Sequence, residues 1–483
     1  MRVEKTDFLK LFLITLLLIL QKVEAQQNLL FSNDIYSGIS ASSLSPTQTY
    51  INPNPWDIQI FSEDINVYND YAYISKGNLL GLIKEEIVAA DPKKGITGAN
   101  QAHVFDYYNK DLANLFFNSD VLGPSFFFKS KIGETDFNIG LFTRLRTQTS
   151  VVDFDNYFRF QNQNLSRPIE YAVSPFKTSF MNWGELGLNF ATEIFRQSDY
   201  KWVLGINLKY EMGFDAYNLQ NNKDLHISTE VNAQNHDQTT ATSYDIAASY
   251  VTNYNFETEK YDFKQQGSGL GLDLGLSFIN KFPDSETYDL KVDFNILDVG
   301  YVKFNGENHV FIGDTKVLLD NNSTFDNTKF QSIKQYLGLL STEVYGDPNK
   351  SHISDGFKIG LPTSIHLALS KNIRPNHYLS FNWIQRTPIF ENSLKRINTF
   401  SATYSVQKPA IAYGFSTAFY DYKNLQFGAY LRLGPLILGS ENVFPLLFNH
   451  KKLHAANFFI GLKLYPFWDN DFKRHRRAKC NCD

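Results

Sequence analysis

Several short groups of residues have types that could support catalysis or metal binding, but each lacks an essential member. Residues 414–418 (GFSTA) lack the second glycine of a nucleophile elbow and lie within an alternating run, which argues against serine hydrolysis. Residues 347–351 (DPNKS) open like a calcium loop, but His352 replaces the required glycine and Lys358 replaces the closing glutamate. The histidines are scattered and form no HExxH motif. We therefore expect no catalytic residues, no metal site and no enzymatic activity.

Cofactors and nucleic acid are not expected to bind either. Gly267, Gly269 and Gly271 have the spacing of a phosphate-binding loop, but no helical pattern follows them. The net charge of -4 and the isoelectric point of about 6.2 indicate that the chain has no basic surface.

The strongest pattern in the chain is an alternation of apolar and polar residues between positions 267 and 304. Every second position over residues 270–278 is apolar, and glycine, aspartate and serine lie between them. The pattern resumes over residues 290–296, with Lys291 and Asp293 on the opposite face. A transmembrane β-barrel needs this arrangement, because lipid lies outside the barrel and a polar interior lies inside. A soluble β-protein whose apolar face is covered by a second sheet is the alternative.

Charged residues on the polar faces of such strands are predicted to face the barrel lumen. They are Arg144, Arg146, Glu185, Lys209, Glu211, Asp273, Lys291, Asp293 and Arg432. Because both signs are present, the set indicates a hydrogen-bonded interior that holds a plug, and not the single-sign lining of an ion-selective pore. An open diffusion porin is the alternative.

The chain is predicted to fold as an all-β, transmembrane antiparallel barrel of about fourteen strands. Strand patterns lie at residues 56–74, 123–132, 136–147, 180–195, 201–217, 268–280, 288–298, 357–370, 377–385, 397–406, 410–420, 424–433, 435–442 and 455–467. Long and short connections alternate with one exception, as expected when extracellular loops are long and periplasmic turns are short. An even number of strands returns the C-terminus to the periplasm.

Shorter segments flank the barrel, which spans residues 56–467. Residues 1–25 have the basic start, short apolar core and small-residue end of a secretory signal peptide. Residues 26–55 are rich in Ser, Asn, Thr and Pro and are expected to enter the barrel as an N-terminal plug. Residues 468–483 form a basic periplasmic tail that ends with the only two cysteines. A disordered end, an anchor to anionic lipid or a periplasmic partner, and thiol chemistry all remain open for this tail.

Two of the long connections are unusually apolar and have helical spacing. The residues concerned are Leu80, Leu82, Phe105, Tyr108 and Phe116 in the first connection, and Phe330, Tyr336 and Leu337 in the second. Apolar patches outside the membrane mark capture of a hydrophobic substrate, docking of a partner, or loops that fold onto one another as a cap.

Three segments resemble a family of outer-membrane barrels from Bacteroidota whose function is largely unknown. They are residues 267–304, residues 43–58 (SLSPTQTYINPNPWDI) and residues 431–442 (LRLGPLILGSEN). That family is related in architecture to FadL-type transporters of hydrophobic compounds and to the PorV component of type IX secretion. The resemblance implies location in the outer membrane of a Gram-negative bacterium and contact with outer-membrane lipid.

Two functions remain open on this basis. The leading hypothesis is a FadL-like channel that takes up a hydrophobic small molecule. The alternative is a structural barrel that binds a periplasmic or secretion-machinery protein. Pro362 bears on the choice, because a proline in the eighth strand pattern removes a ladder hydrogen bond and can open a lateral gate to lipid. A proline at an ordinary bulge is the alternative.

Overall fold

The computed structural model describes residues 29–82, 86–108, 110–133, 135–159, 169–231, 237–281, 287–320 and 332–466. The expected signal peptide and basic tail lie outside these residues, so both stay predictions. Among the described residues, no helix is long and apolar enough to cross a membrane.

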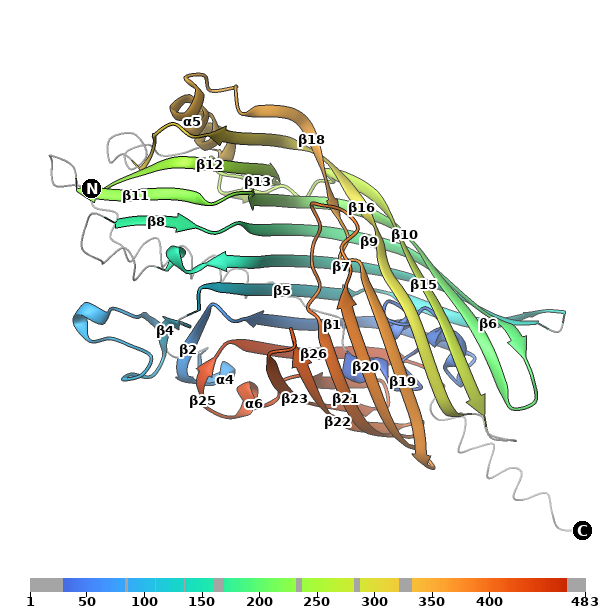
Figure 1. The fold of residues 1–483 in the computed structure, drawn as a ribbon. Coiled ribbons are helices and arrows are strands. Elements are labelled where there is room, and N and C mark those ends of the chain that lie inside the picture. Colours follow the sequence, from blue (N-terminus) through green and yellow to red (C-terminus); the bar gives the residue numbers. More distant parts are fainter. Residues whose placement is uncertain are drawn as a thin grey trace, which may run out of the picture.

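Fourteen antiparallel strands close into a ring (Figure 1). In order around the ring they are β1 (Trp56–Asn69), β5 (Leu112–Leu122) continued by β6 (Ser125–Ile132), β7 (Thr135–Asp155), β9 (Phe176–Arg196), β10 (Tyr200–Asn221), β15 (Gly267–Lys281), β16 (Tyr288–Gly313), β18 (His352–Gly360) continued by β19 (Ser364–Arg374), β20 (His377–Arg386), β21 (Thr399–Gln407), β22 (Ile411–Tyr420), β23 (Asn424–Leu433), β24 (Leu436–Ser440) and β26 (Ala455–Leu464). Strands β5 and β6 count as one, since both pair with β1 and β7, and β18 and β19 both pair with β16. The ring closes between β26 and β1. The predicted barrel of about fourteen antiparallel strands is confirmed.

Side chains alternate between the outside of the ring and its lumen. Leu208 on β10 is 59% exposed, whereas its neighbours Asn207 and Lys209 are buried. Leu208 pairs with Leu188 of β9 and Leu272 of β15, so apolar side chains of three strands form one continuous surface. We call this outward apolar surface of the ring the lipid belt. An apolar exterior around a polar interior is the arrangement that a bilayer requires of a barrel.

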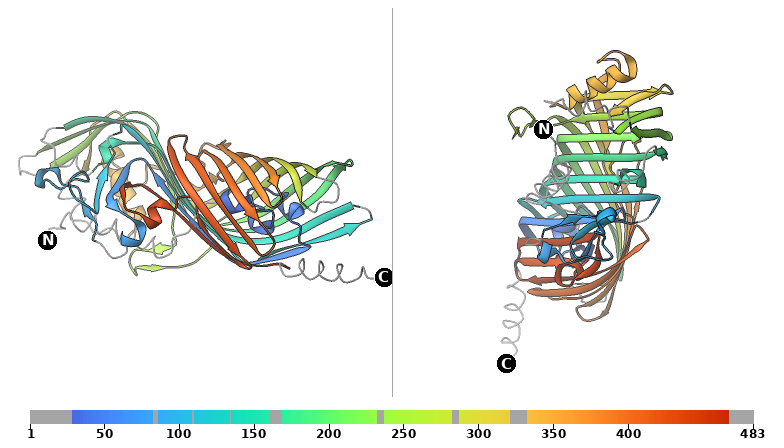
Figure 2. Two further views of the ribbon diagram at one scale, coloured as in Figure 1. Left: turned by 90° about the horizontal axis from the view of Figure 1, so that it is seen from below. Right: turned by 90° about the vertical axis from the view of Figure 1, so that its left-hand side faces the viewer.

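The wall is much taller on one side of the ring than on the other (Figures 1 and 2). Strands β7, β9, β10 and β16 contain 21, 21, 22 and 26 residues, whereas β20 to β23 contain nine or ten. About 9–11 residues cross a membrane, so the long strands continue well beyond it. Beyond the end of β15, β12 (Asp237–Val251) lies between β10 and β16. Strands β8 (Ile169–Val173), β11 (Leu225–Val231) and β17 (Val317–Asp320) widen this part, which we call the extended wall. We call the end of the barrel that carries the extended wall the loop end. We call the opposite end, where short turns join the strands, the turn end.

The expectation that residues 75–122, 148–179, 218–267 and 299–356 are loops is therefore wrong for much of their length, because these segments contain wall strands. Phe116, expected in an apolar loop, lies in β5 and is completely buried. The strand pattern is weak here, as expected for strands that continue beyond the length needed to cross a bilayer. Their outward side chains therefore need not be apolar, and β12 reads DQTTATSYDIAASYV.

The remaining elements lie at the loop end. A separate four-stranded sheet contains β25 (His450–Leu453), β2 (Ala72–Gly77), β4 (Val104–Tyr107) and β3 (Val88–Ala89), and β13 (Tyr254–Asn255) pairs with β14 (Lys260–Tyr261). The helices there are α4 (Leu79–Leu82), η2 (Pro92–Lys94), η3 (Asn156–Phe158), α5 (Ile333–Tyr345) and α6 (Phe444–Leu447). Helix α5 packs on β16 and β17 of the extended wall, and α4 contacts α6.

The N-terminal segment fills the ring (Figure 2). Residues 29–55, which we call the plug, contain α2 (Leu29–Ser32), η1 (Gly38–Ala41) and α3 (Gln48–Ile51), and nearly all of their side chains are buried. Wall glycines make room for them, since a Cβ atom at Gly205 would come within 2.5 Å of the Pro46 backbone. The segment therefore lies in the lumen, where the sequence predicts a plug.

Candidate functional site in the barrel lumen

Arg432 and Lys463 fasten the plug at the turn end of the barrel. Arg432 Nε lies 2.9 Å from Asp34 Oδ2, and its guanidinium group stacks over the Tyr36 ring at 4.9 Å. Lys463 Nζ lies 2.5 Å from Asp57 Oδ2 and donates a hydrogen bond of 2.7 Å to the Tyr36 carbonyl. The four charged side chains are completely buried, so each charge depends on its partner.

Wall side chains also satisfy polar groups along the plug. Asn207 Nδ2 donates to the Ser42 carbonyl at 2.9 Å, and Lys291 Nζ donates to Gln48 Oε1 at 3.1 Å. Asp293 lies 2.8 Å from Lys291 Nζ and balances its charge. The plug helices are too short to satisfy their own backbone groups, so these wall contacts replace solvent for a segment that is removed from water. The predicted lumen residues Lys291, Asp293 and Arg432 therefore hold the plug.

The other predicted lumen residues form a network next to the plug, toward the loop end. This charged layer consists of Asp120, Arg144, Arg146, Glu185, Lys209, Glu211, Asp273, Asp298 and Arg396, all buried. Arg146 Nη1 lies 2.7 Å from Glu185 Oε1 and 3.1 Å from Asp298 Oδ1, and Lys209 Nζ lies 2.9 Å from Asp273 Oδ1. Most predicted lumen charges therefore pair with one another.

The sequence interpretation missed Asp120, Asp298 and Arg396. Asp298 is the hub of the charged layer, because it contacts Arg146, Lys209 and Arg396. It has a positive φ of 55° and lies where the register of β15 and β16 shifts, so the period-two rule does not apply at this position. A charged residue at the end of a clear strand pattern is the one sequence signal that points to it.

Glu211 is the unmatched member of the charged layer. Neither of its carboxylate oxygens accepts a hydrogen bond among the described residues. It lies directly opposite Glu185 in the β9–β10 ladder, and Lys209 on its own strand is already paired with two aspartates. The nine members divide into five acidic and four basic groups, so the layer is one positive charge short.

The ring has a gap in its wall at the loop end of β19 and β20. The β19–β20 ladder ends at the Ser364–Arg386 pair, beside a break at Pro362 that separates β18 from β19. The break does not shift the register of β18 and β19 against β16. The pairs Tyr301–Gly360 and Leu297–Ser364 are four residues apart on both sides of the ladder, so no residue is inserted or lost. Beyond the break, β18 pairs with β16 on one edge, and the connection of residues 387–398 meets the other edge at Gly360. We call residues 387–398 the hatch segment.

Backbone hydrogen bonds hold the hatch segment both in the gap and against β7. The Lys395 amide donates to Ser150 Oγ at 3.2 Å, and Gln148 Nε2 donates to the Lys395 carbonyl at 3.0 Å. The Gly360 amide donates to the Asn392 carbonyl at 2.7 Å, and the Leu394 amide donates to the Gly360 carbonyl at 3.1 Å. Phe390 packs on the Tyr301 ring with centroids 5.3 Å apart. At its far end the segment is joined to the charged layer through Arg396 and Asp298, whose side chains are 2.5 Å apart.

An apolar cluster lies behind the hatch segment, on the loop-end side of the charged layer. It contains Met181, Trp183, Ala216, Val251, Val302, Phe304, Phe357, Ile359, Leu361 and Leu394. Leu394 is the contribution of the hatch segment, and it is completely buried. The hatch segment therefore separates an apolar interior from the outer surface of the barrel.

The predicted capture residues do not form one site. Leu82 in α4 and Phe105 in β4 are half-buried, and the Tyr108 hydroxyl lies 3.0 Å from His454 Nδ1. In α5, Tyr336 is exposed and Leu337 packs against the extended wall. Figures 1 and 2 show α5 far from the β2–β4 sheet. Phe330 and the side chain of Leu80 lie outside the described residues. The capture role proposed for all eight residues stays a prediction.

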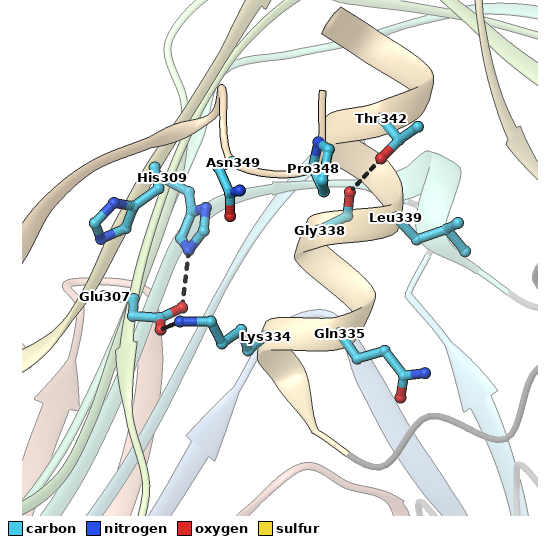
Figure 3. A pocket seen from close by; sticks show the side chains of 10 residues that line it. Glu307, His309, Lys334, Gln335, Gly338, Leu339, Thr342, Pro348 and Asn349 are labelled. Atoms are coloured by element: carbon cyan, nitrogen blue, oxygen red, sulfur yellow. Dashed lines mark hydrogen bonds and ion pairs between the residues drawn. The ribbon is translucent and has the colours of Figure 1, made fainter. Parts of the chain in front are cut away.

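A cavity of about 470 Å³ lies between α5 and the extended wall (Figure 3). Glu307 lies at its edge, 2.5 Å from Lys334 Nζ and 3.3 Å from His309 Nε2. His309 Nδ1 is 3.0 Å from Ser351 Oγ, which resembles a hydrolytic triad. Ser351 is completely buried, so a substrate carbonyl does not reach its hydroxyl in this arrangement.

Docking of α5 is expected to weaken as the pH falls below about 6.5. Burial lowers the pKa of His309 despite the neighbouring Glu307, so the undocked state binds a proton more readily than the docked state. Burial opposes ionisation of Glu307, but hydrogen bonds from Lys334, Tyr250 and His309 lower its pKa, which adds acid sensitivity at still lower pH. Hydrogen exchange of Ile333–Tyr345, corrected for intrinsic rates, is expected to be faster at pH 5.5 than at pH 7.5. His309→Gln is the control that removes most of this difference, and equal protection of the native protein at both pH values would contradict the prediction.

Comparison with solved structures finds distant similarity to two channels and to a FadL homologue. The deltaS2 mutant of the TodX monoaromatic hydrocarbon channel has a TM-score of 0.36 and 10% identity, covering 89% of this chain and 93% of that chain. The CymD monoaromatic hydrocarbon channel has a TM-score of 0.27 and 10% identity, covering 90% and 97%. A FadL homologue from Pseudomonas aeruginosa has a TM-score of 0.22 and 8% identity, covering 89% and 94%. These TM-scores and sequence identities are too low to support a conclusion about the function of this protein.

No curated protein matches the sequence. A protein-family model matches residues 51–441, which include the end of the plug and all ring strands except β26. The chain therefore belongs to DUF5723, a family of unknown function.

Proposed function

We propose that this protein is an outer-membrane β-barrel of a Gram-negative bacterium that takes up hydrophobic small molecules. A closed antiparallel ring with an apolar exterior is suited to a bilayer, and such barrels are typical of outer membranes. The observation that carries the transport proposal is the hatch segment, which fills a wall gap beside a buried apolar cluster.

The route follows from what blocks the lumen. The plug and the charged layer fill the centre of the ring with hydrogen-bonded and ion-paired groups, which disfavours straight passage of an apolar solute. The apolar cluster ends at the wall gap, and Leu394 is the only member that belongs to the hatch segment. Displacement of this segment exposes the cluster without breaking the ring ladders, but it must break the contacts of Lys395 with Ser150 and of Arg396 with Asp298. A molecule in the cluster then leaves sideways toward lipid, where it is more soluble than in the periplasm.

Locking the hatch segment is expected to abolish uptake. A Cβ atom at Gly360 would touch the Ser393 hydroxyl, so Gly360→Cys with Ser393→Cys places two thiols in contact, in a chain whose Cys480 and Cys482 are changed to serine. Oxidation is expected to stop uptake of a fluorescent apolar probe by cells, and reduction to restore it. Ser393→Cys alone is the matched control. Unchanged uptake after a disulfide is verified by mass spectrometry would overturn the transport proposal, provided that both variants fractionate with the outer membrane.

The extended wall favours a second candidate, a barrel that binds another protein in the manner of PorV. Strand β16 has 26 residues, more than twice the ~9–11 needed to cross a bilayer, and transport of a small molecule does not require the excess. Ile353 on β18 is 58% exposed. A photocrosslinker at this position that captures one defined protein in intact cells, together with absence of probe uptake, would favour this candidate.

A further inference from the structure

The hairpin of residues 252–266, between β12 and β15, exposes several aromatic rings. Tyr254, Phe256, Tyr261 and Phe263 are 39%, 41%, 46% and 66% exposed. They pack only partly on one another, with Tyr254 and Phe256 rings 5.0 Å apart. We call residues 252–266 the aromatic hairpin. Such a group of exposed rings is unfavourable in water and marks a contact surface.

The aromatic hairpin lies on the outer face of the barrel, at the loop-end edge of the lipid belt. Gln265 Nε2 lies 3.3 Å from the hydroxyl of Tyr210, a belt residue on β10. Phe263 packs on Phe214 with centroids 4.3 Å apart, just beyond the end of the β10–β15 ladder. Ser268 and Leu270 are the first outward residues of β15, and Leu270 is 73% exposed. The aromatic surface is therefore continuous with the surface assigned to lipid.

Helix α6 and the residue after it form a similar exposed apolar surface on another part of the ring. Phe444, Leu447 and Phe448 are 40%, 63% and 58% exposed. The Phe444 ring packs on Phe427, an outward belt residue of β23, at 5.4 Å, and the Val443 amide donates to the Phe427 carbonyl at 2.9 Å. β23 is separated from β10 by many strands in the ring order. Two unrelated connections therefore place apolar rings at the same edge of the lipid belt.

We infer that the aromatic hairpin and α6 are two membrane anchors, seated at the boundary between headgroups and acyl chains of the outer leaflet. Aromatic rings are favoured at this depth, because the ring is apolar and the tyrosine hydroxyl can stay hydrogen-bonded, as the Tyr261 hydroxyl is to the Asp215 carboxylate. The hairpin also carries Glu257, Glu259, Lys260, Asp262 and Lys264. Since this mixture has no excess of positive charge, the anchor depends on aromatic burial and not on attraction to anionic lipid.

The need for two anchors follows from the shape of the barrel. The extended wall is on the side of β7, β9, β10 and β16. On the other side, β20 to β23 have only nine or ten residues each and do not continue beyond the ring. Because the strands differ so much in length around the ring, their ends do not by themselves set the angle between the barrel axis and the bilayer. Anchors on β10–β15 and on β23 fix the depth of the barrel on two separated sides. This inference rests on the membrane location proposed above and is independent of transport.

Spin labels test the depth of both anchors in proteoliposomes of phosphatidylcholine. Phe263→Cys and Leu447→Cys are labelled singly in a chain whose Cys480 and Cys482 are changed to serine. Leu208→Cys in the lipid belt and Ile353→Cys in the extended wall are the controls, with closely matched exposure of 59% and 58%. We expect both anchor labels to have greater oxygen accessibility, and lower accessibility to a water-soluble nickel complex, than the label at Ile353.

The outcomes separate the alternatives. An anchor label with the water-like values of Ile353, while Leu208 reads as bilayer, overturns the inference for that anchor. Spin–spin broadening that disappears on dilution with unlabelled protein also overturns it, because it shows that a second copy covers the surface. A water-like value at Leu208 itself refutes the membrane location, which is a different failure.

Discussion

Replacing Asp298 with asparagine is expected to destabilise the barrel by about 3–5 kcal/mol, because buried cations lose their shared negative charge. Arg146, Lys209 and Arg396 all contact this carboxylate inside the ring. Asparagine has nearly the same shape, but it carries no charge and its amide group presents N–H donors to groups that are themselves donors. The free energy of unfolding of the protein in lipid vesicles, measured by urea titration, checks the expected loss.

Asp314→Asn is the matched control for this variant. Asp314 also pairs with a lysine, Lys223, at 2.9 Å, but its side chain is 81% exposed. An exposed pair contributes about 0–1 kcal/mol, so this change is expected to have little effect. The loss of the Arg396 contact in Asp298→Asn is also expected to speed hydrogen exchange in the hatch segment. Equal unfolding midpoints for the two variants would show that the charged layer does not hold the wall together.

Leu208→Arg is expected to cost about 2–4 kcal/mol in a bilayer, because it places a charge on the lipid face. Leu208 is 59% exposed, and its ladder partners Leu188 and Leu272 are apolar. The arginine cannot reach the polar lumen, since the wall separates the two faces. Folding yield into lipid vesicles and the free energy of unfolding both report the effect.

Ile353→Arg provides the control with equal exposure. Ile353 is 58% exposed, but it lies on β18 in the extended wall, where water is expected outside. A surface substitution in water usually changes stability by less than about 0.5 kcal/mol. Equal losses for the two variants would mean that the lipid belt and the extended wall face the same solvent, and the transmembrane assignment would then be wrong.

Within the lipid belt, alternation alone is sufficient to predict the strands and their faces. Leu208 and Lys209 are assigned to opposite faces by sequence, and the structure exposes the first and buries the second. The rule works there because lipid demands an apolar side chain at every outward position. It fails in β12, where the sequence is largely polar. It also fails in β5, where Phe116 is expected in a loop but is buried in the wall.

Alternation and composition are sufficient to predict a barrel of about fourteen strands, many of its lumen-facing charges and an N-terminal segment suited to be a plug. The pairing of the buried charges, including those of Asp120, Asp298 and Arg396, depends on the tertiary structure. Arg146 and Asp298 are 152 positions apart, and Arg396 is 98 positions from Asp298. Their meeting depends on closure of the ring and on the local bulge at Asp298, and neither is encoded in the spacing of the residues. The hatch segment shows the same limit, because a connection between two strands becomes part of the wall only where the neighbouring ladder ends.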